Sequence, residues 1–146
     1  MERVDWLVLL IDASGRPGGL DPVRIQKGMF LLAREAALPP PERYRFRAYN
    51  YGPMSVEVYR DLDRLVEGGL VRRRPAKGYR WSLFDVTAEG AAHAARVAAL
   101  AQREAPLARK RLERIVALLD RLDFAELLRT VYERYPQYAA RSVFRR

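Results

Sequence analysis

The segment Tyr49–Gly90 constrains the fold of this 146-residue chain more than any other part of the sequence. Apolar residues recur at helical spacing over residues 54–67, and Gly68-Gly69 supplies the left-handed stop that ends many helices. Residues 70–84 then have the pattern of a short basic hairpin. Thr87 follows as the expected N-cap of another helix. Any fold of this chain must therefore place a helix, a two-stranded hairpin and a second helix in direct succession.

Short breakers divide the rest of the chain into further elements. Pro and Gly clusters interrupt the helical pattern at residues 14–19 and 39–41. The expected helices span residues 4–13, 21–36, 54–67, 87–103, 106–122 and 123–135, the expected strands span residues 44–49, 70–74 and 79–83, and a tight turn is expected at Tyr51-Gly52-Pro53. Asp21, Ser55 and Asp123 are the expected N-caps of three of these helices.

This order of elements predicts a mainly α protein with a small β-wing (α+β), specifically a winged helix-turn-helix with two extra C-terminal helices. Residues 1–103 are the expected winged-helix domain, and residues 104–146 are a helical extension used for dimerisation or packing. The extension carries an apolar seam made of Leu112, Ile115, Leu119 and Leu122. Seventeen residues separate Ala36 from Met54, where a standard helix-turn-helix has a short turn. That long connection leaves room for a protein-binding role.

The composition limits the kinds of protein that this chain can be. Apolar residues make up 49% and charged residues 31%, which is ordinary for a globular protein. No apolar run approaches the roughly 20 residues that cross a bilayer, and Asp5 and Asp12 bracket the first apolar run, unlike a signal peptide. The absence of cysteine excludes disulfides, thiolate metal sites and a cysteine nucleophile. We therefore expect a cytoplasmic protein without a membrane partner.

The net charge of +9 attracts polyanions, of which DNA is the most common in a cytoplasm. Only three of the 27 basic residues are lysines, and arginine suits bidentate contacts with phosphate and guanine. A GC-rich genome, whose codons favour arginine, explains the same ratio. The excess is uneven, with a net +3 over residues 1–90 and a net +6 over residues 91–146.

The helix at 54–67 and the wing at 70–84 carry the residues expected to contact duplex DNA, which are Ser55, Tyr59, Arg60, Arg64, Arg72, Arg73, Arg74, Lys77 and Arg80. Glu57 and Glu67 share the helix face with the arginines and repel phosphate, so a solvated, charge-paired helix face explains that part equally well. The wing cluster contains no acid, although charge on a hairpin also serves to blunt a sheet edge. Neutralising phosphates there would make binding salt-dependent.

The remaining motifs do not predict an enzyme. His93 is the single histidine, so neither a metal site nor a catalytic triad is expected. The sequence lacks a phosphate-binding glycine loop, and no cofactor is expected. Aromatic residues interleave with arginines over residues 44–51, a pattern that can stack single-stranded bases. An alternating strand with its apolar side inward explains this pattern more simply.

Two family resemblances rest on these motifs. VYRDLDRLVEGGLVRRR followed by VTAEG resembles winged-helix transcription regulators of the PadR and MarR type, which implies a DNA-binding fold over about residues 54–95. A longer resemblance is to small bacterial proteins of the YwgA-like and Panacea-type families. It rests on IQKGMFLLAREA (25–36), YNYGPMS (49–55), DLDRLVEGGLV (61–71) and YPQYAARSVFR (135–145). The Panacea type implies an antitoxin that holds partner toxins.

Two hypotheses follow from the sequence. In the first, the protein is a homodimeric winged-helix transcription regulator that binds double-stranded DNA. In the second, it is a winged-helix interaction module, such as an antitoxin or a phage-defence accessory, that binds a protein and not DNA.

Overall fold

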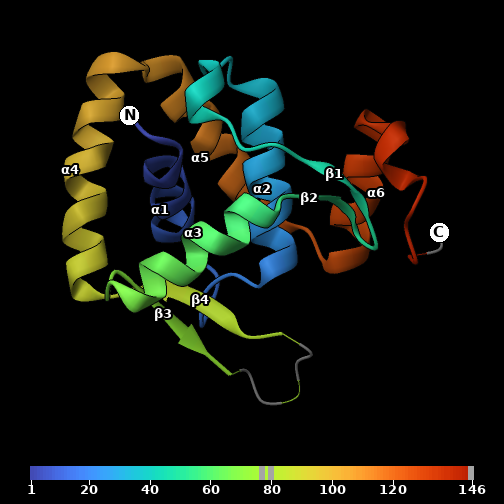
Figure 1. Cartoon of the computed structure of the whole chain (residues 1–146), viewed down its shortest axis with the longest axis horizontal. Coiled ribbons are helices and arrows are strands. Elements are labelled where there is room, and N and C mark those ends of the chain that lie inside the picture. The colour runs from blue at the N-terminus through green and yellow to red at the C-terminus, as the bar shows by residue number, and fades with distance from the viewer. Residues whose placement is uncertain (76–77, 79–80, 145–146) are drawn as a thin grey trace.

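The structure is a computed structural model that describes residues 1–75, 78 and 81–144. Over these residues the chain is mainly helical with two small antiparallel sheets (Figure 1). This confirms the predicted α+β class, although the sequence predicts only the hairpin after α3 and not the second sheet. The α-helices are α1 Arg3–Ala13, α2 Pro22–Glu35, α3 Val56–Glu67, α4 Ala88–Glu104, α5 Pro106–Arg121 and α6 Phe124–Arg134, and the 3-10 helices are η1 Pro40–Glu42 and η2 Pro136–Ala139. The strands are β1 Arg47–Tyr49, β2 Gly52–Met54, β3 Val71–Arg74 and β4 Leu83–Val86.

Helix α1 is the centre of the core. Every residue from Trp6 to Ile11 is buried, because α2, α3, α4, α5 and β4 all contact this helix (Figure 1). A helix that is apolar on all sides is stable only when it is surrounded in this way. The indole of Trp6 still has its polar partner, since Nε1 donates to Glu42 Oε1 at 2.9 Å. The first helix of the sequence therefore organises the fold and is not a peripheral element.

The C-terminal helices pack onto this core. Leu112, Ile115 and Leu119 of the predicted seam on α5 are buried within the chain. Helices α2 and α5 approach closely at Gly28, where a Cβ atom would lie 2.7 Å from Leu119 Cδ1. Buried Arg24 caps the end of α5 by donating to the carbonyls of Leu119 and Leu122. Contacts inside one chain thus account for this seam.

Two polar side chains of α2 hold the start of α3. The side-chain amide of Gln26 donates to the carbonyl of Ser55 and accepts from its N–H, at 2.9 and 2.8 Å. Lys27 Nζ, which is almost completely buried, donates to the Pro53 carbonyl at 3.0 Å. Together these bonds satisfy three backbone groups that leave β2 and enter α3, and they fix where α3 begins.

The glycine pair after α3 and the Thr87–Gly90 motif form one interlocked unit. Thr87 Oγ1 donates to the Gly69 carbonyl at 2.6 Å and accepts from the N–H of Gly90 at 3.0 Å. The N–H of Thr87 donates to the Leu70 carbonyl. Gly90 sits against that same carbonyl, and a Cβ atom there would lie 1.9 Å from the Leu70 oxygen. The start of α4 is therefore fitted to the end of α3.

The predicted strand positions are wrong in two places. Only residues 47–49 of the expected strand at 44–49 form β1, which pairs with β2 at residues 52–54. Gly52 and Pro53 thus lie in a strand and not in the turn. The second strand of the wing is described as residues 83–86, which pair with β3 from Val71–Val86 to Arg74–Leu83, and residues 81 and 82 of the expected strand at 79–83 lie outside it. Phe84 also exchanges backbone hydrogen bonds with Leu20 at 2.8 and 2.9 Å. Residues 79 and 80 lie outside the described residues.

We predict that Gly90→Ala destabilises the protein. In an open helical position this change stabilises by up to about 1 kcal/mol, because alanine is the better helix former. Here the added Cβ meets the Leu70 carbonyl, and overpacking of this kind typically costs about 1–3 kcal/mol. Urea unfolding should therefore show a lower free energy of unfolding. A stabilised Gly90→Ala protein would contradict the close contact.

We predict that Lys27 makes stability depend on pH. Burial lowers the pKa of Lys27 from 10.5 to about 7, although the charge of Asp21 acts in the opposite direction. Between these two values the unfolded chain binds the proton that the folded protein has released, so stability rises with pH. From pH 7.5 to 9.5 the free energy of unfolding should increase by about 2.5 kcal/mol. Lys27→Met should remove this slope in denaturant titrations, and parallel pH profiles for the two proteins would refute the assignment.

Candidate nucleic-acid interface

The outer face of α3 carries the two arginines predicted to enter a groove. Val58, Leu62 and Leu65 are buried against the core. Arg60 and Arg64 are four residues apart, so both project from the opposite face, where they are exposed. Arg64 Nη1 lies 3.5 Å from Asp61 Oδ1, while Arg60 has no ion pair within the described part of the chain. The helix therefore presents two accessible guanidinium groups.

Ser55 and Tyr59 do not lie with these arginines. Ser55 is only 1% exposed, and its Oγ accepts from the N–H of Val58 as the N-cap of α3. Its predicted role in DNA contact is wrong, because the hydroxyl faces the protein. Tyr59 is 40% exposed but lies at the side of α3, where it lines a cavity of about 170 Å³ with Tyr49 and Trp81. Burial raises the pKa of the Tyr59 hydroxyl.

The wing arginines are exposed but have acidic partners. On β3, Arg72 Nε lies 3.1 Å from Asp85 Oδ1, and Arg74 Nη2 lies 3.0 Å from Asp85 Oδ2. The residue between them points to the other side of the strand, where Arg73 pairs with Asp63 of α3 and covers the Phe84 ring at 5.4 Å. The other two predicted wing contacts, Lys77 and Arg80, lie outside the described residues.

Asp85 is the residue that the sequence analysis missed. The wing sequence contains no acid between residues 70 and 80, but antiparallel pairing places Asp85 directly opposite Arg72. Partial burial alone would raise the pKa of the Asp85 carboxyl, but hydrogen bonds and attraction from Arg72 and Arg74 outweigh it and hold the pKa below its usual value. Asp85 consequently stays ionised at neutral pH and orients two arginines side by side.

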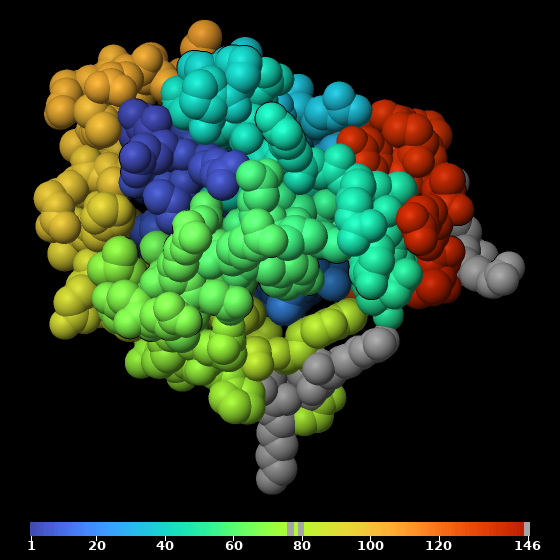
Figure 2. Space-filling model, viewed as in Figure 1, coloured from blue at the N-terminus to red at the C-terminus, as the bar shows by residue number. Residues whose placement is uncertain are grey.

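The formal charges on this surface balance. In α3, β3 and β4 the basic residues are Arg60, Arg64, Arg72, Arg73 and Arg74, and the acidic residues are Glu57, Asp61, Asp63, Glu67 and Asp85. Glu57 is engaged by Arg3 at 2.7 Å, and Asp61 is buried. Figure 2 shows α3 and β3 side by side on the face turned to the viewer. The described part of this surface is therefore rich in arginine without being strongly positive, while the sequence adds Lys77 and Arg80 between β3 and β4.

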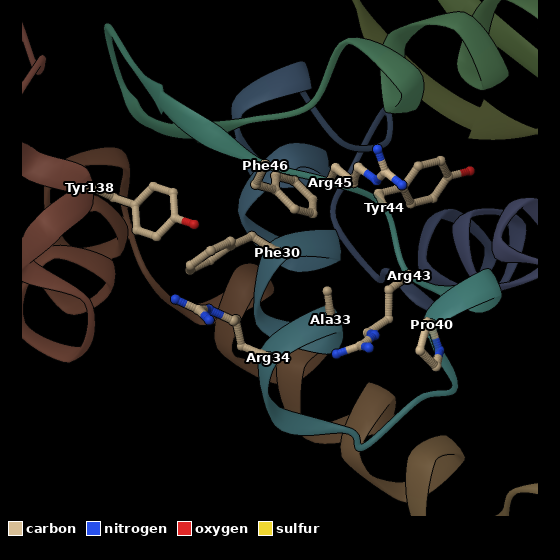
Figure 3. A pocket seen from close by; sticks show the side chains of 9 residues that line it. All are labelled: Phe30, Ala33, Arg34, Pro40, Arg43, Tyr44, Arg45, Phe46 and Tyr138. Carbon is tan, nitrogen blue, oxygen red and sulfur yellow. The ribbon is translucent and has the colours of Figure 1, made fainter.

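A second cluster of arginines lies elsewhere on the molecule. Arg34 of α2 and Arg43 and Arg45 of the segment before β1 line a pocket that also contains Phe46 and Tyr138 (Figure 3). The sequence showed the alternation of arginine and aromatic residues after position 43. It gave no signal for Arg34 or Tyr138, which reach the pocket from helices far apart in sequence.

Other types of site find no support in the described residues. Over residues 1–75, 78 and 81–144, no group of three His, Asp or Glu side chains is placed to hold a metal ion. Within the same residues, no helix combines the length and the apolar character that crossing a membrane requires. Comparison with family models, with curated proteins and with solved structures gave no match to this chain.

Proposed function

We propose that the protein binds duplex DNA as a winged-helix protein, with α3 against a groove and the β3–β4 hairpin against the phosphate backbone. The ion pair between Arg73 and Asp63 carries this proposal. It ties the hairpin to the outer face of α3, so that the groove arginines and the wing arginines belong to one exposed surface. In this proposal the protein is a cytoplasmic transcription regulator that acts as a homodimer, as readers of two-fold operators commonly do.

The ion pairs of the wing are compatible with phosphate binding. Arg72 and Arg74 are each about half exposed, and exposed ion pairs contribute at most ~1 kcal/mol to stability. A phosphate that approaches the hairpin can therefore share or replace Asp85 at small cost.

The balanced charge favours a second candidate function, a winged-helix module that binds a protein. The described residues of α3, β3 and β4 hold equal numbers of arginines and carboxylates, which limits the counterion release that they can contribute on DNA. Such a surface does suit a protein partner with complementary charges of both signs. The two functions make opposite predictions for binding to DNA at low salt.

We predict that random-sequence duplex DNA binds with a salt-dependent affinity that Arg60→Gln/Arg64→Gln weakens at least 10-fold. Loss of two phosphate or base contacts should also reduce the slope of log K against log salt by about 2. Fluorescence anisotropy of a labelled duplex, between 50 and 300 mM salt, measures both quantities. The control is Arg96→Gln/Arg103→Gln, which removes the same charge from exposed positions on α4.

The outcomes of this titration separate the two functions. An equal loss in both double variants would mean that only net charge matters and that α3 is not the contact surface. A wild-type protein that fails to bind at 50 mM salt would favour the protein-binding module.

We predict that Asp85→Asn tightens DNA binding. The change releases Arg72 and Arg74 and removes one charge that repels phosphate. The affinity for DNA at 100 mM salt should therefore rise about 3- to 10-fold, and the slope of log K against log salt should become steeper by about 1. Glu133→Gln, an equal charge change at an exposed position of α6, should have little effect. If Asp85→Asn and the wild type bind DNA with equal affinity, the wing is not part of the DNA interface.

A further inference from the structure

The pocket that contains Arg34 is separate from the α3–hairpin surface. It has a volume of about 290 Å³ and lies between α2, η1 with the segment that follows it, and η2. In Figure 3 Ala33 forms its floor, with the guanidinium groups of Arg34 and Arg43 on either side, and Phe46 and Tyr138 stand above Arg34. The pocket thus combines two cations with aromatic walls.

Three aromatic rings hold Arg34 without neutralising it. Its guanidinium carbon lies 5.7 Å from the centroid of Phe30, 5.3 Å from that of Tyr135 and 5.8 Å from that of Tyr138. Cation–π contacts of this kind orient the guanidinium but leave its N–H donors available. Arg34 remains exposed in spite of these contacts.

The nearby carboxylates are engaged by other residues. Glu35 accepts from the Tyr135 hydroxyl at 2.8 Å and pairs with Arg134 at 3.3 Å. Glu42 accepts from the indole of Trp6. As a result, neither Arg34 nor Arg43 has a carboxylate partner among the residues that the structure describes, in contrast to the arginines of the wing.

Arg45 contributes less to the pocket. Its backbone N–H donates to Glu57 at 3.3 Å, and its positive charge helps to lower the pKa of that carboxyl. Glu57 therefore partly balances the charge of Arg45. Its side chain runs toward Tyr44 in Figure 3 and away from Arg34. The cations available to a ligand are therefore Arg34 and Arg43.

Packing alone explains only part of this arrangement. Phe30 makes edge-to-face contacts with Phe46, Tyr135 and Tyr138 at centroid distances of 4.7–5.4 Å, which fastens η2 to α2. Those contacts require neither an arginine at position 43 nor an open volume beside the rings. The packing therefore leaves two exposed cations beside an open cavity that is partly walled by rings.

We propose that this pocket binds a nucleoside monophosphate. Guanidinium groups bind a phosphate through paired N–H donors, and the partly exposed rings of Phe46 and Tyr138 offer apolar faces to a nucleobase. The volume is at the lower end of the range for small-molecule sites, which suits one nucleotide better than a dinucleotide cofactor. This site does not depend on the DNA-binding proposal, because none of its residues belongs to α3 or to the hairpin.

Isothermal titration calorimetry with AMP, GMP, CMP and UMP tests the proposal on the full chain. At least one nucleotide should bind saturably with a stoichiometry of one, and inorganic phosphate and the matching nucleoside should each bind at least 10-fold more weakly. Arg43→Gln and Arg34→Gln should each reduce affinity at least 10-fold. Arg96→Gln on α4, which removes the same charge far from the rings, should stay within 2-fold of wild type.

Arg43→Gln is the decisive variant, because Arg43 takes no part in the ring contacts and its loss leaves the packing intact. The absence of saturable binding for all four nucleotides would overturn the proposal, as would wild-type affinity in Arg43→Gln. If Arg96→Gln loses as much nucleotide affinity as Arg43→Gln, the loss reflects net charge alone and the proposal is overturned. A 5′-phosphorylated single-stranded decamer that binds at least 10-fold tighter than any mononucleotide would reassign the pocket to a nucleic-acid end.

Discussion

The hydrogen bonds from Gln26 and Lys27 to residues 53–55 are the constraint on which the rest of the structure depends. They hold the first turn of α3 against α2, and α2 in turn packs on the central helix α1. Because α3 leads directly through Gly68-Gly69 into β3, the position of the hairpin follows from the same contacts. The hydrogen bond from Lys27 requires that its amino group be buried, and burial lowers the pKa of that group because it disfavours the charged form.

The arrangement of charge separates the two candidate surfaces. On α3 and the hairpin, Asp63 and Asp85 hold Arg72, Arg73 and Arg74, so a ligand there competes with existing partners. In the pocket beside α2, aromatic rings hold Arg34 in place of carboxylates, and its charge stays available. Tyr44 connects the two regions, since it lines the pocket and its hydroxyl donates to Asp61 of α3 at 2.7 Å. Net charge alone would not have distinguished these surfaces.

Much of the fold was predictable because its signals are local. Asp21, Ser55, Thr87 and Asp123 each cap a helix as expected, and Asp123 with Glu126 forms the predicted capping box. The candidate site was predicted less well. Ser55 is buried and Tyr59 turns to a side cavity, because β1–β2 and α2 pack against that part of α3. The second wing strand was expected too early, because its register with β3 is set by pairing across the hairpin, which spacing along the chain does not fix.

The sequence by itself determined the helices and their caps, since each depends on spacing or hydrogen bonds within a few residues. Only the tertiary structure decided which of the described arginines have carboxylate partners. Arg34 and Arg43 come from different elements and meet across a pocket, while Asp85 reaches Arg72 only through strand pairing. Such electrostatic partners depend on distance in space, and position along the chain does not specify that distance.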